Sequence, residues 1–233
     1  MSEDIAKFNA AQAALDYVKD GMIVGLGTGS TSASFVKQLG ERVRQGLRVK
    51  GVPTSEAPRN LAEQVGVPLL EISQVTSLDL DVDGAEEVDP AFRLIKGGGG
   101  ALLREKIVAA ASKQMVVIAD ESKWVETLGA FPLPVEVTRF GFALTQQRVT
   151  EALRATGCAG DEVTLRITGK ANEPVITDGG NYILDAHTKR IPDAEKLGAA
   201  LKDIAGVVEH GLFIGLSQVV IIGKAKGAEV KTL

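Results

Sequence analysis

The chain has 233 residues, and its 26 Lys and Arg against 30 Asp and Glu give a net charge of −4. This balance argues against a nucleic-acid-binding protein, because neutralising phosphates requires a clustered excess of cationic side chains. A single cysteine excludes an internal disulfide and a multi-cysteine zinc site, and the two histidines lie far apart in sequence. Carboxylates and lysines are therefore the candidates for acid–base chemistry.

No apolar run reaches the roughly 18–20 residues of a membrane span, and the N-terminus is acidic where a secretory signal would be basic. We therefore expect a soluble cytoplasmic protein that binds no membrane. Aromatic residues make up only 4% of the chain, so the expected core is aliphatic, as in a parallel sheet covered by Ala- and Leu-rich helices.

The first 130 residues alternate short apolar runs with segments of helical periodicity. Predicted helices cover 3–19, a segment after 32 that ends at Gly40, 56–65 and 101–112, and predicted strands or strand-like runs cover 22–26, 49–52, 67–70, 78–83 and 115–119. This alternation predicts an α/β fold with a Rossmann-like, doubly wound and mainly parallel sheet.

After residues 131–134 the pattern changes to that of a smaller α+β domain. The predicted elements are a strand at 135–137, a helix at 145–155, an alternating strand at 162–168, a hairpin of 174–177 and 182–184 around 178–181, and a helix at 193–204. The run 219–223 is apolar on both faces, which predicts its return to the first sheet. We therefore predict one discontinuous domain of 1–130 with 208–233 and a second of 131–207.

The first candidate site is the segment 25–32, which follows a predicted strand and opens a helix. Backbone N–H groups at a helix start favour an anion, and glycines let it approach closely. A dinucleotide fingerprint would need glycine where Ser30 stands, and a P-loop would need a lysine before Lys37. The hydroxyls fit a small phosphate ester, although a tight turn with an ordinary Ser/Thr cap is the alternative.

The second candidate is the acidic strand that ends in Gly84. Alternation places Asp79, Asp81 and Asp83 on one face, and the strand's carboxyl end is where doubly wound folds bind ligands. Clustered carboxylates could hold a hard cation or contact a sugar, and a solvated acidic loop is the third reading.

The third candidate is Lys96 followed by four glycines that run into a helix carrying Glu105. Such a run costs stability, because each glycine loses much backbone freedom on folding, so it suggests a close approach of the backbone to a ligand. A flexible loop and a surface Glu105 are the alternatives. The fourth candidate is Lys123, which follows the strand 115–119; it too could be a solvated lysine. We expect all four motifs to meet at one cleft.

The motifs GTGSTS, DGAEE, KGGGGALLREK and ADESK, in this order and spacing, resemble those of the type A ribose-5-phosphate isomerases. The later FPLPVEV, TDGGNYILD, GVVEHGLF and GAEVKTL match as well, so the resemblance covers nearly the whole chain. It implies a cytoplasmic homo-oligomer, with a dimer favoured, that uses no cofactor or metal. The implied reaction interconverts D-ribose 5-phosphate and D-ribulose 5-phosphate by proton transfer through an enediolate, in the non-oxidative branch of the pentose phosphate pathway.

The resemblance also implies roles for individual residues. Glu105 corresponds to the general base. The residues that correspond to substrate-binding positions are Thr28, Gly29, Ser30, Thr31, Asp83, Gly84, Ala85, Glu86, Lys96, Gly97, Gly98, Gly99 and Lys123. Glu86 departs from the family's usual aspartate by one methylene, which changes the reach of its carboxylate.

Two readings of other classes compete with an isomerase. One is a sugar-phosphate-sensing effector module of a transcriptional regulator, which would need an attached DNA-binding domain and would not need Glu105. The other is a nucleotide- or coenzyme A-binding transferase, against which the missing fingerprints of the first loop argue. We expect both histidines to be structural.

Overall fold

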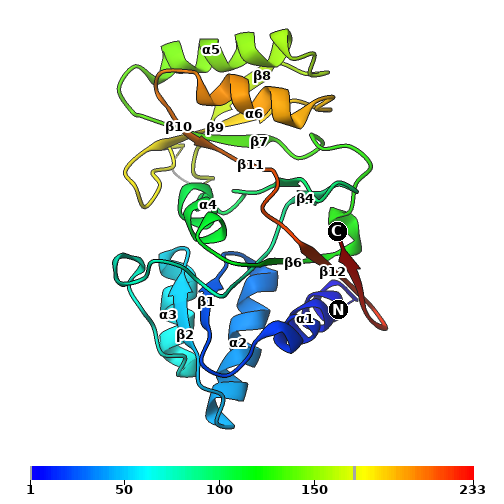
Figure 1. Cartoon of the computed structure of the whole chain (residues 1–233). Coiled ribbons are helices and arrows are strands. Elements are labelled where there is room, and N and C mark those ends of the chain that lie inside the picture. The colour runs from blue at the N-terminus through cyan, green and yellow to red at the C-terminus, as the bar shows by residue number, and fades with distance from the viewer. Residues whose placement is uncertain (1, 170–171) are drawn as a thin grey trace. The chain divides into compact units, whose positions relative to one another are not determined.

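The computed structural model describes residues 2–169 and 172–233, which form two compact units (Figure 1). The first consists of 1–85, 104–124 and 215–233, and the second of 86–103 and 125–214. This division differs from the predicted one chiefly in residues 86–103. They pack with the second unit because they contain two short strands that pair with each other, and one of these also pairs with a strand at 212–213.

The first unit is built on a six-stranded sheet of order β13-β12-β6-β3-β1-β2, parallel except for the edge strand β13. Its strands are β1 (Ile23–Leu26), β2 (Lys50–Pro53), β3 (Leu80–Asp83), β6 (Met115–Asp120), β12 (Val219–Lys224) and β13 (Gly227–Thr232). Its helices are α1 (Ser2–Ala14), α2 (Ser30–Arg44), α3 (Glu56–Val65) and, from Arg104 on, α4 (Leu102–Ala110), with 3₁₀ turns at Leu15–Tyr17, Ile72–Gln74 and Glu121–Lys123. The predicted doubly wound, mainly parallel sheet is confirmed.

Alternation along the strands gives each face of this sheet its own core. On one face Val24, Leu26 and Val82 pack against the apolar side chains of α1 and α2, and together they form a large cluster. On the opposite face Val108 of α4 packs with Val52 and Leu78. The strand β12 pairs with β6, so the predicted return of 219–223 to the first sheet is confirmed.

Two local predictions for this unit are wrong. The helix α2 does not end at Gly40 but continues to Arg44. Close packing of α3 against α2 leaves no room for a side chain at position 40, because a Cβ at Gly40 would lie 2.6 Å from Cγ2 of Val65. Residues 67–70 form only an isolated bridge, Gly51 with Leu69, because the chain leaves the edge strand β2 after this single pairing.

The second unit has a four-stranded antiparallel sheet of order β10-β7-β9-β8. Its strands are β7 (Leu133–Val137), β8 (Glu162–Leu165), β9 (Tyr182–His187) and β10 (Val207–His210), and its helices are α5 (Phe142–Ala155) and α6 (Ala194–Lys202). Both helices supply apolar side chains to one cluster over the sheet, and Figure 1 shows them side by side. A three-stranded sheet contains β4 (Glu87–Val88), β5 (Leu94–Ile95) and β11 (Leu212–Phe213).

The predicted hairpin of 174–177 with 182–184 does not form. Both edges of β9 are already paired, one with β7 and the other with β8. The turn 177–181 folds against β7 instead, where buried Glu136 accepts hydrogen bonds from Thr177 Oγ1 (2.8 Å) and Asn181 Nδ2 (2.9 Å). Across the described residues of both units, no helix is long and apolar enough to cross a bilayer.

Candidate active site

The strand order of the first unit marks one place as a ligand site. From β1 the chain moves outward to β2, then returns past β1 to β3 and continues to β6 and β12. The two directions separate between β1 and β3, and doubly wound sheets bind ligands at the carboxyl ends of the strands at this point. The segment 28–32 follows β1 there, and Asp83 ends β3.

Asp83 joins these two strand ends. Its side chain is buried, and its Oδ1 accepts hydrogen bonds from Thr28 N (3.1 Å), Ser32 Oγ (3.2 Å) and Gly84 N (2.7 Å). Gly84 N also lies 3.1 Å from Ser32 Oγ. An ionised oxygen that accepts several N–H and O–H bonds is a strong local anchor. Asp83 therefore fixes the loop after β1 to the loop after β3.

Close packing explains the glycines of the first loop. A Cβ at Gly27 would lie 2.0 Å from Asp83 Oδ1 and 2.6 Å from Asp83 Cα, so no larger residue fits without moving the backbone. Gly29 has φ +121°, which L side chains rarely adopt. It precedes α2 without a side chain that could cap the helix. The first turn of α2 therefore presents backbone N–H groups to any anion at the strand ends.

The hydroxyls of this loop divide into two kinds. Thr28 Oγ1 lies 2.8 Å from both Thr54 Oγ1 and Ser55 Oγ. Because Thr54 Oγ1 donates to the Leu26 carbonyl (3.0 Å), its remaining role towards Thr28 is that of an acceptor. Ser30 is exposed and Thr31 half-buried at the start of α2. Thr28 is thus held within the protein, whereas Ser30 and Thr31 stand where a ligand could approach.

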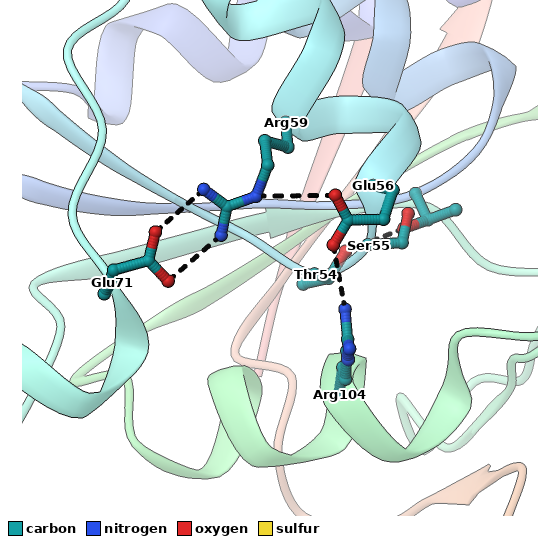
Figure 2. A network of polar contacts seen from close by, with 7 residues as sticks. Thr54, Ser55, Glu56, Arg59, Glu71 and Arg104 are labelled. Carbon is teal, nitrogen blue, oxygen red and sulfur yellow. Dashed lines mark hydrogen bonds and ion pairs between the residues drawn. The ribbon is translucent and has the colours of Figure 1, made fainter. Parts of the chain in front are cut away.

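Thr54 and Ser55 were not among the predicted site residues. They follow β2 directly, and the rule that polar residues after parallel strands share one sheet edge could have found them. In Figure 2, the residues after them form a chain of ion pairs: Arg104 with Glu56 (3.5 Å), Glu56 with Arg59 (3.7 Å), and Arg59 with Glu71 (2.8 Å). The hydrogen bond from Arg59 holds the pKa of Glu71 below its usual range.

Glu105 is 3% exposed, so it is not a surface residue of α4. Backbone bonds of Leu78 with Ala111 and Lys113 (both 2.9 Å) tie the end of α4 to the amino end of β3. The first turn of α4 consequently lies towards the carboxyl ends of the strands. Val108 shares a helix face with Glu105 and packs on Gly25 of β1, so the Glu105 carboxylate is on the face that covers the sheet.

Asp79 is not part of an acidic cluster with Asp83. It precedes β3 at the amino end of the strand, where it accepts hydrogen bonds from Lys113 Nζ (2.7 Å) and Ile23 N (3.0 Å). Both bonds lower the pKa of Asp79, and the hydrogen bond from Lys113 has the larger effect. Among the described residues no group of three or more His, Cys, Asp or Glu is arranged to hold a metal ion.

Lys123 ends the 3₁₀ turn after β6 and is half-buried. This turn is capped by buried Asp120, whose Oδ1 accepts from Ser122 N (2.9 Å) and Ser122 Oγ (2.5 Å). The first unit thus places Lys123 at the carboxyl end of β6, as the sequence predicts.

The second unit contains the glycine loop. Gly97 and Gly100 have φ of +104° and +81°, and Gly100 N donates to Gly97 O (3.0 Å) to close a tight turn. Lys96 is 1% exposed, and its Nζ lies 5.5 Å from the centre of the Phe213 ring. Its backbone N donates to Gly211 O (2.9 Å), which joins the start of the loop to the chain before β11.

Glu86 reaches this loop. Its Oε1 accepts a hydrogen bond from Gly98 N (3.0 Å), and a Cβ at Gly98 would lie 2.3 Å from that oxygen. Glu86 N in turn donates to Ile95 O (2.9 Å). The Glu86 carboxylate is therefore engaged with the backbone of the glycine loop.

Arg166, which contacts the glycine loop, and its partner Asp185 are not among the predicted site residues. Arg166 Nη1 donates to the carbonyls of Gly97 (2.9 Å) and Gly98 (3.1 Å), while Nε and Nη2 bind the Asp185 carboxylate (2.9 and 2.5 Å). Nothing in the local sequence links 166 to a loop nearly 70 residues earlier. The predicted meeting of all four motifs at one cleft stays a prediction, because the motifs belong to separate units.

The comparisons with known proteins agree with these features. Residues 50–227 match the family model described as ribose 5-phosphate isomerase A (phosphoriboisomerase A). A ribose-5-phosphate isomerase A from Maricaulis maris is 55% identical over 224 residues, 96% of each chain. The solved structure of ribose 5-phosphate isomerase A from Methanocaldococcus jannaschii is 40% identical, with a TM-score of 0.89 and 98% of each chain covered.

A D-ribose-5-phosphate isomerase solved in complex with phospho-erythronic acid is 38% identical, with a TM-score of 0.91 over the whole of both chains. These matches decide against the effector module and the transferase. The chain belongs to the ribose-5-phosphate isomerase A family, the aldose–ketose isomerases that interconvert ribose 5-phosphate and ribulose 5-phosphate.

Proposed function

We propose that this enzyme isomerises its substrate by proton transfer through an enediolate, with Glu105 as the base. The observation that carries the proposal is a carboxylate 3% exposed in the first turn of α4, on the helix face that covers the sheet. A base on one side of a planar enediolate can take the proton from C2 and return it to C1. A positioned carboxylate is sufficient for both transfers.

Charge on the enediolate oxygens requires donors that are already in place. We assign this role to the backbone N–H groups of Gly97 and Gly99 and to the ammonium groups of Lys96 and Lys123, while the Gly98 N–H holds Glu86 in the substrate-binding loop. Lys96 is buried, which strengthens its interaction with a developing negative charge. Neither lysine forms a Schiff base in this scheme, so borohydride treatment in the presence of substrate leaves both lysines unmodified.

The phosphate is assigned to the start of α2. Its uncapped N–H groups, the hydroxyls of Ser30 and Thr31 and the preceding Thr28–Gly29 form an anion site of the kind found at helix N-termini. The relative solved in complex with phospho-erythronic acid supports the class of ligand that we assign, since that compound combines a phosphate ester with a planar carboxylate, which resembles an enediolate in charge and shape.

The loop 83–86 is assigned to the sugar hydroxyls. Asp83 and Glu86 relay hydroxyl protons during furanose opening and exchange between O1 and O2, and Gly84 and Ala85 supply the backbone between them. We further propose that the enzyme is a cytoplasmic homo-oligomer, with a dimer favoured, that needs no cofactor or metal. Sedimentation analysis and an assay in the presence of a chelator test these two statements.

Glu105→Gln tests the central assignment. The amide keeps the shape of the side chain but cannot accept a proton, so kcat should fall by about 10²–10⁴-fold with little change in substrate affinity. Glu63→Gln, an exposed glutamate on α3, is the matched control and should behave as wild type. A folded Glu105→Gln enzyme with near-normal kcat places the base elsewhere, and Asp83 is then the first residue to test.

A further inference from the structure

Arg166 is held by hydrogen bonds both at its backbone and at its guanidinium group. Its backbone N donates to Ile183 O (2.8 Å) and its carbonyl accepts from Val175 N (2.9 Å), which hold the residue beside β9. Its guanidinium uses Nε and Nη2 for the two oxygens of Asp185 and Nη1 for the carbonyls of Gly97 and Gly98. The side chains of Arg166 and Asp185 are 15% and 19% exposed, so this paired fork is largely shielded from water.

This contact determines how two peptide groups of the glycine loop are turned. In a trans peptide the N–H points opposite to the C=O. Because the carbonyls of Gly97 and Gly98 point at Arg166, the N–H groups of Gly98 and Gly99 point away from it. The Gly98 N–H does so and reaches Glu86 Oε1 at 3.0 Å. The same geometry directs the Gly99 N–H away from the guanidinium.

Glycine makes such a constraint necessary. A run of four glycines offers each peptide many orientations of similar energy, so its N–H groups are not fixed by the chain itself. A cation at the carbonyl side removes that freedom. It also polarises the two peptides, which makes their N–H groups stronger donors.

We propose that Arg166, held by Asp185, is a positioning residue for the isomerase reaction, because it orients the Gly98 and Gly99 N–H groups towards Glu86 and the substrate oxygens. This inference rests on the proposed role of Lys96–Gly99 as substrate-binding residues. Arg166 acts through the backbone of the loop and does not itself touch substrate.

Arg166→Met is the principal test. It keeps an unbranched apolar stem but removes all four hydrogen bonds of the guanidinium, so kcat should fall by about 10–100-fold while KM changes less than threefold. Arg166→Lys keeps the charge without the planar fork and should recover part of the loss. Arg154→Met is the matched control: Arg154 pairs with Asp161 in the same unit, but the two side chains are 66% and 46% exposed, so wild-type kinetics are expected.

Asp185→Asn extends the test to the residue that holds the arginine. It leaves an amide oxygen for one of the two bonds, so kcat should fall by only about 3–10-fold. This variant and Arg166→Lys keep the proposal testable if Arg166→Met does not fold, which circular dichroism and the thermal midpoint will show.

Inhibition constants separate positioning from a structural role. In Arg166→Met the affinity for phospho-erythronic acid should fall by about the same factor as kcat, while inhibition by inorganic phosphate should stay within twofold of wild type. An equal weakening of both inhibitors, or a folded Arg166→Met enzyme with kcat within twofold of wild type, overturns the proposal.

Glu105→Gln and Lys96→Met are measured in parallel to identify which statement fails. Near-normal activity in both would contradict the proposed function itself. Loss of activity in both, with normal Arg166→Met kinetics, contradicts only the positioning role of Arg166.

Discussion

The two glycine loops of this enzyme are held in different ways. The loop after β1 is fixed by the neighbouring strand β3: Asp83 binds its backbone, and the Cα of Asp83 leaves no room for a side chain at Gly27. The loop 97–100 is held by side chains from distant segments, Glu86 on its N–H side and Arg166 on its carbonyl side. The first loop is therefore determined by close packing of the main chain, and the second by a few polar contacts.

The difference predicts that equivalent substitutions in the two loops will affect different properties. Gly27→Ala forces the backbone of β3 to move, so the free energy of unfolding should fall by about 3 kcal/mol or more. Gly98→Ala meets only the carboxylate end of Glu86, a flexible side chain, and should cost less than about 1 kcal/mol. Urea unfolding of both variants measures these changes, and equal losses of stability would remove the distinction.

Gly98→Ala should also lower kcat. In Gly27→Ala a change in kcat could not be separated from the expected loss of stability. The Cβ displaces Glu86 Oε1 from the Gly98 N–H, so kcat should fall by roughly 10-fold in a protein that remains folded. The two variants together test whether the second loop tolerates a methyl group structurally but not catalytically. A Gly98→Ala enzyme with wild-type kcat would argue that Glu86 is not needed at that position.

The hydroxyls of the first loop provide a smaller effect. Ser30→Ala combined with Thr31→Ala should raise KM for ribose 5-phosphate by about 10-fold with kcat little changed, because two hydrogen bonds to a charged group are lost. Ser34→Ala, further along α2, is the control and should leave KM unchanged. If KM for the double variant stays at the wild-type value, the phosphate is bound elsewhere.

The smallest expected effect is at the amino end of the six-stranded sheet, the end opposite the loop after β1. The Lys113 hydrogen bond lowers the pKa of Asp79, so this carboxylate adds stability that is complete above its unfolded pKa near 4 and is lost as pH falls through its lower folded value. Asp79→Asn should therefore lower the free energy of unfolding by less than about 1 kcal/mol at pH 7.

The pH dependence of that difference is the more specific prediction. The gap between wild type and Asp79→Asn should be constant above about pH 5 and shrink below pH 4. Denaturant unfolding at several pH values measures it, with kcat at pH 7 expected to be unchanged. A gap that widens towards low pH would contradict the assignment.

The same contrast explains what could be predicted from the sequence. Strand–loop–helix order placed Thr28–Thr31, Asp83 and Lys123 at strand ends, because in a parallel sheet this geometry follows from chain order alone. The helix 56–65 was predicted with its observed bounds. Local sequence patterns were sufficient to predict those parts of the structure that are formed by segments close together in the sequence.

The failures concern contacts between distant segments. Arg166 and Asp185 carry no local signal for their contact with the loop 97–100, and the expected hairpin at 174–184 depended on a strand whose edges were already occupied. Likewise α2 continues through Gly40 because Val65 packs on it. In each case tertiary packing decided between structures that the local sequence leaves equally possible.

The most direct test of the central claim follows the C2 proton itself. Ribose 5-phosphate is converted in deuterated water by wild type and by Glu105→Gln, and NMR records deuterium at C1 of the ribulose 5-phosphate formed. Proton transfer by Glu105 predicts solvent deuterium at C1 with wild type, and a loss of about 10²-fold or more in both isomerisation and labelling with Glu105→Gln. Isomerisation and labelling at near wild-type rates by folded Glu105→Gln would contradict the account.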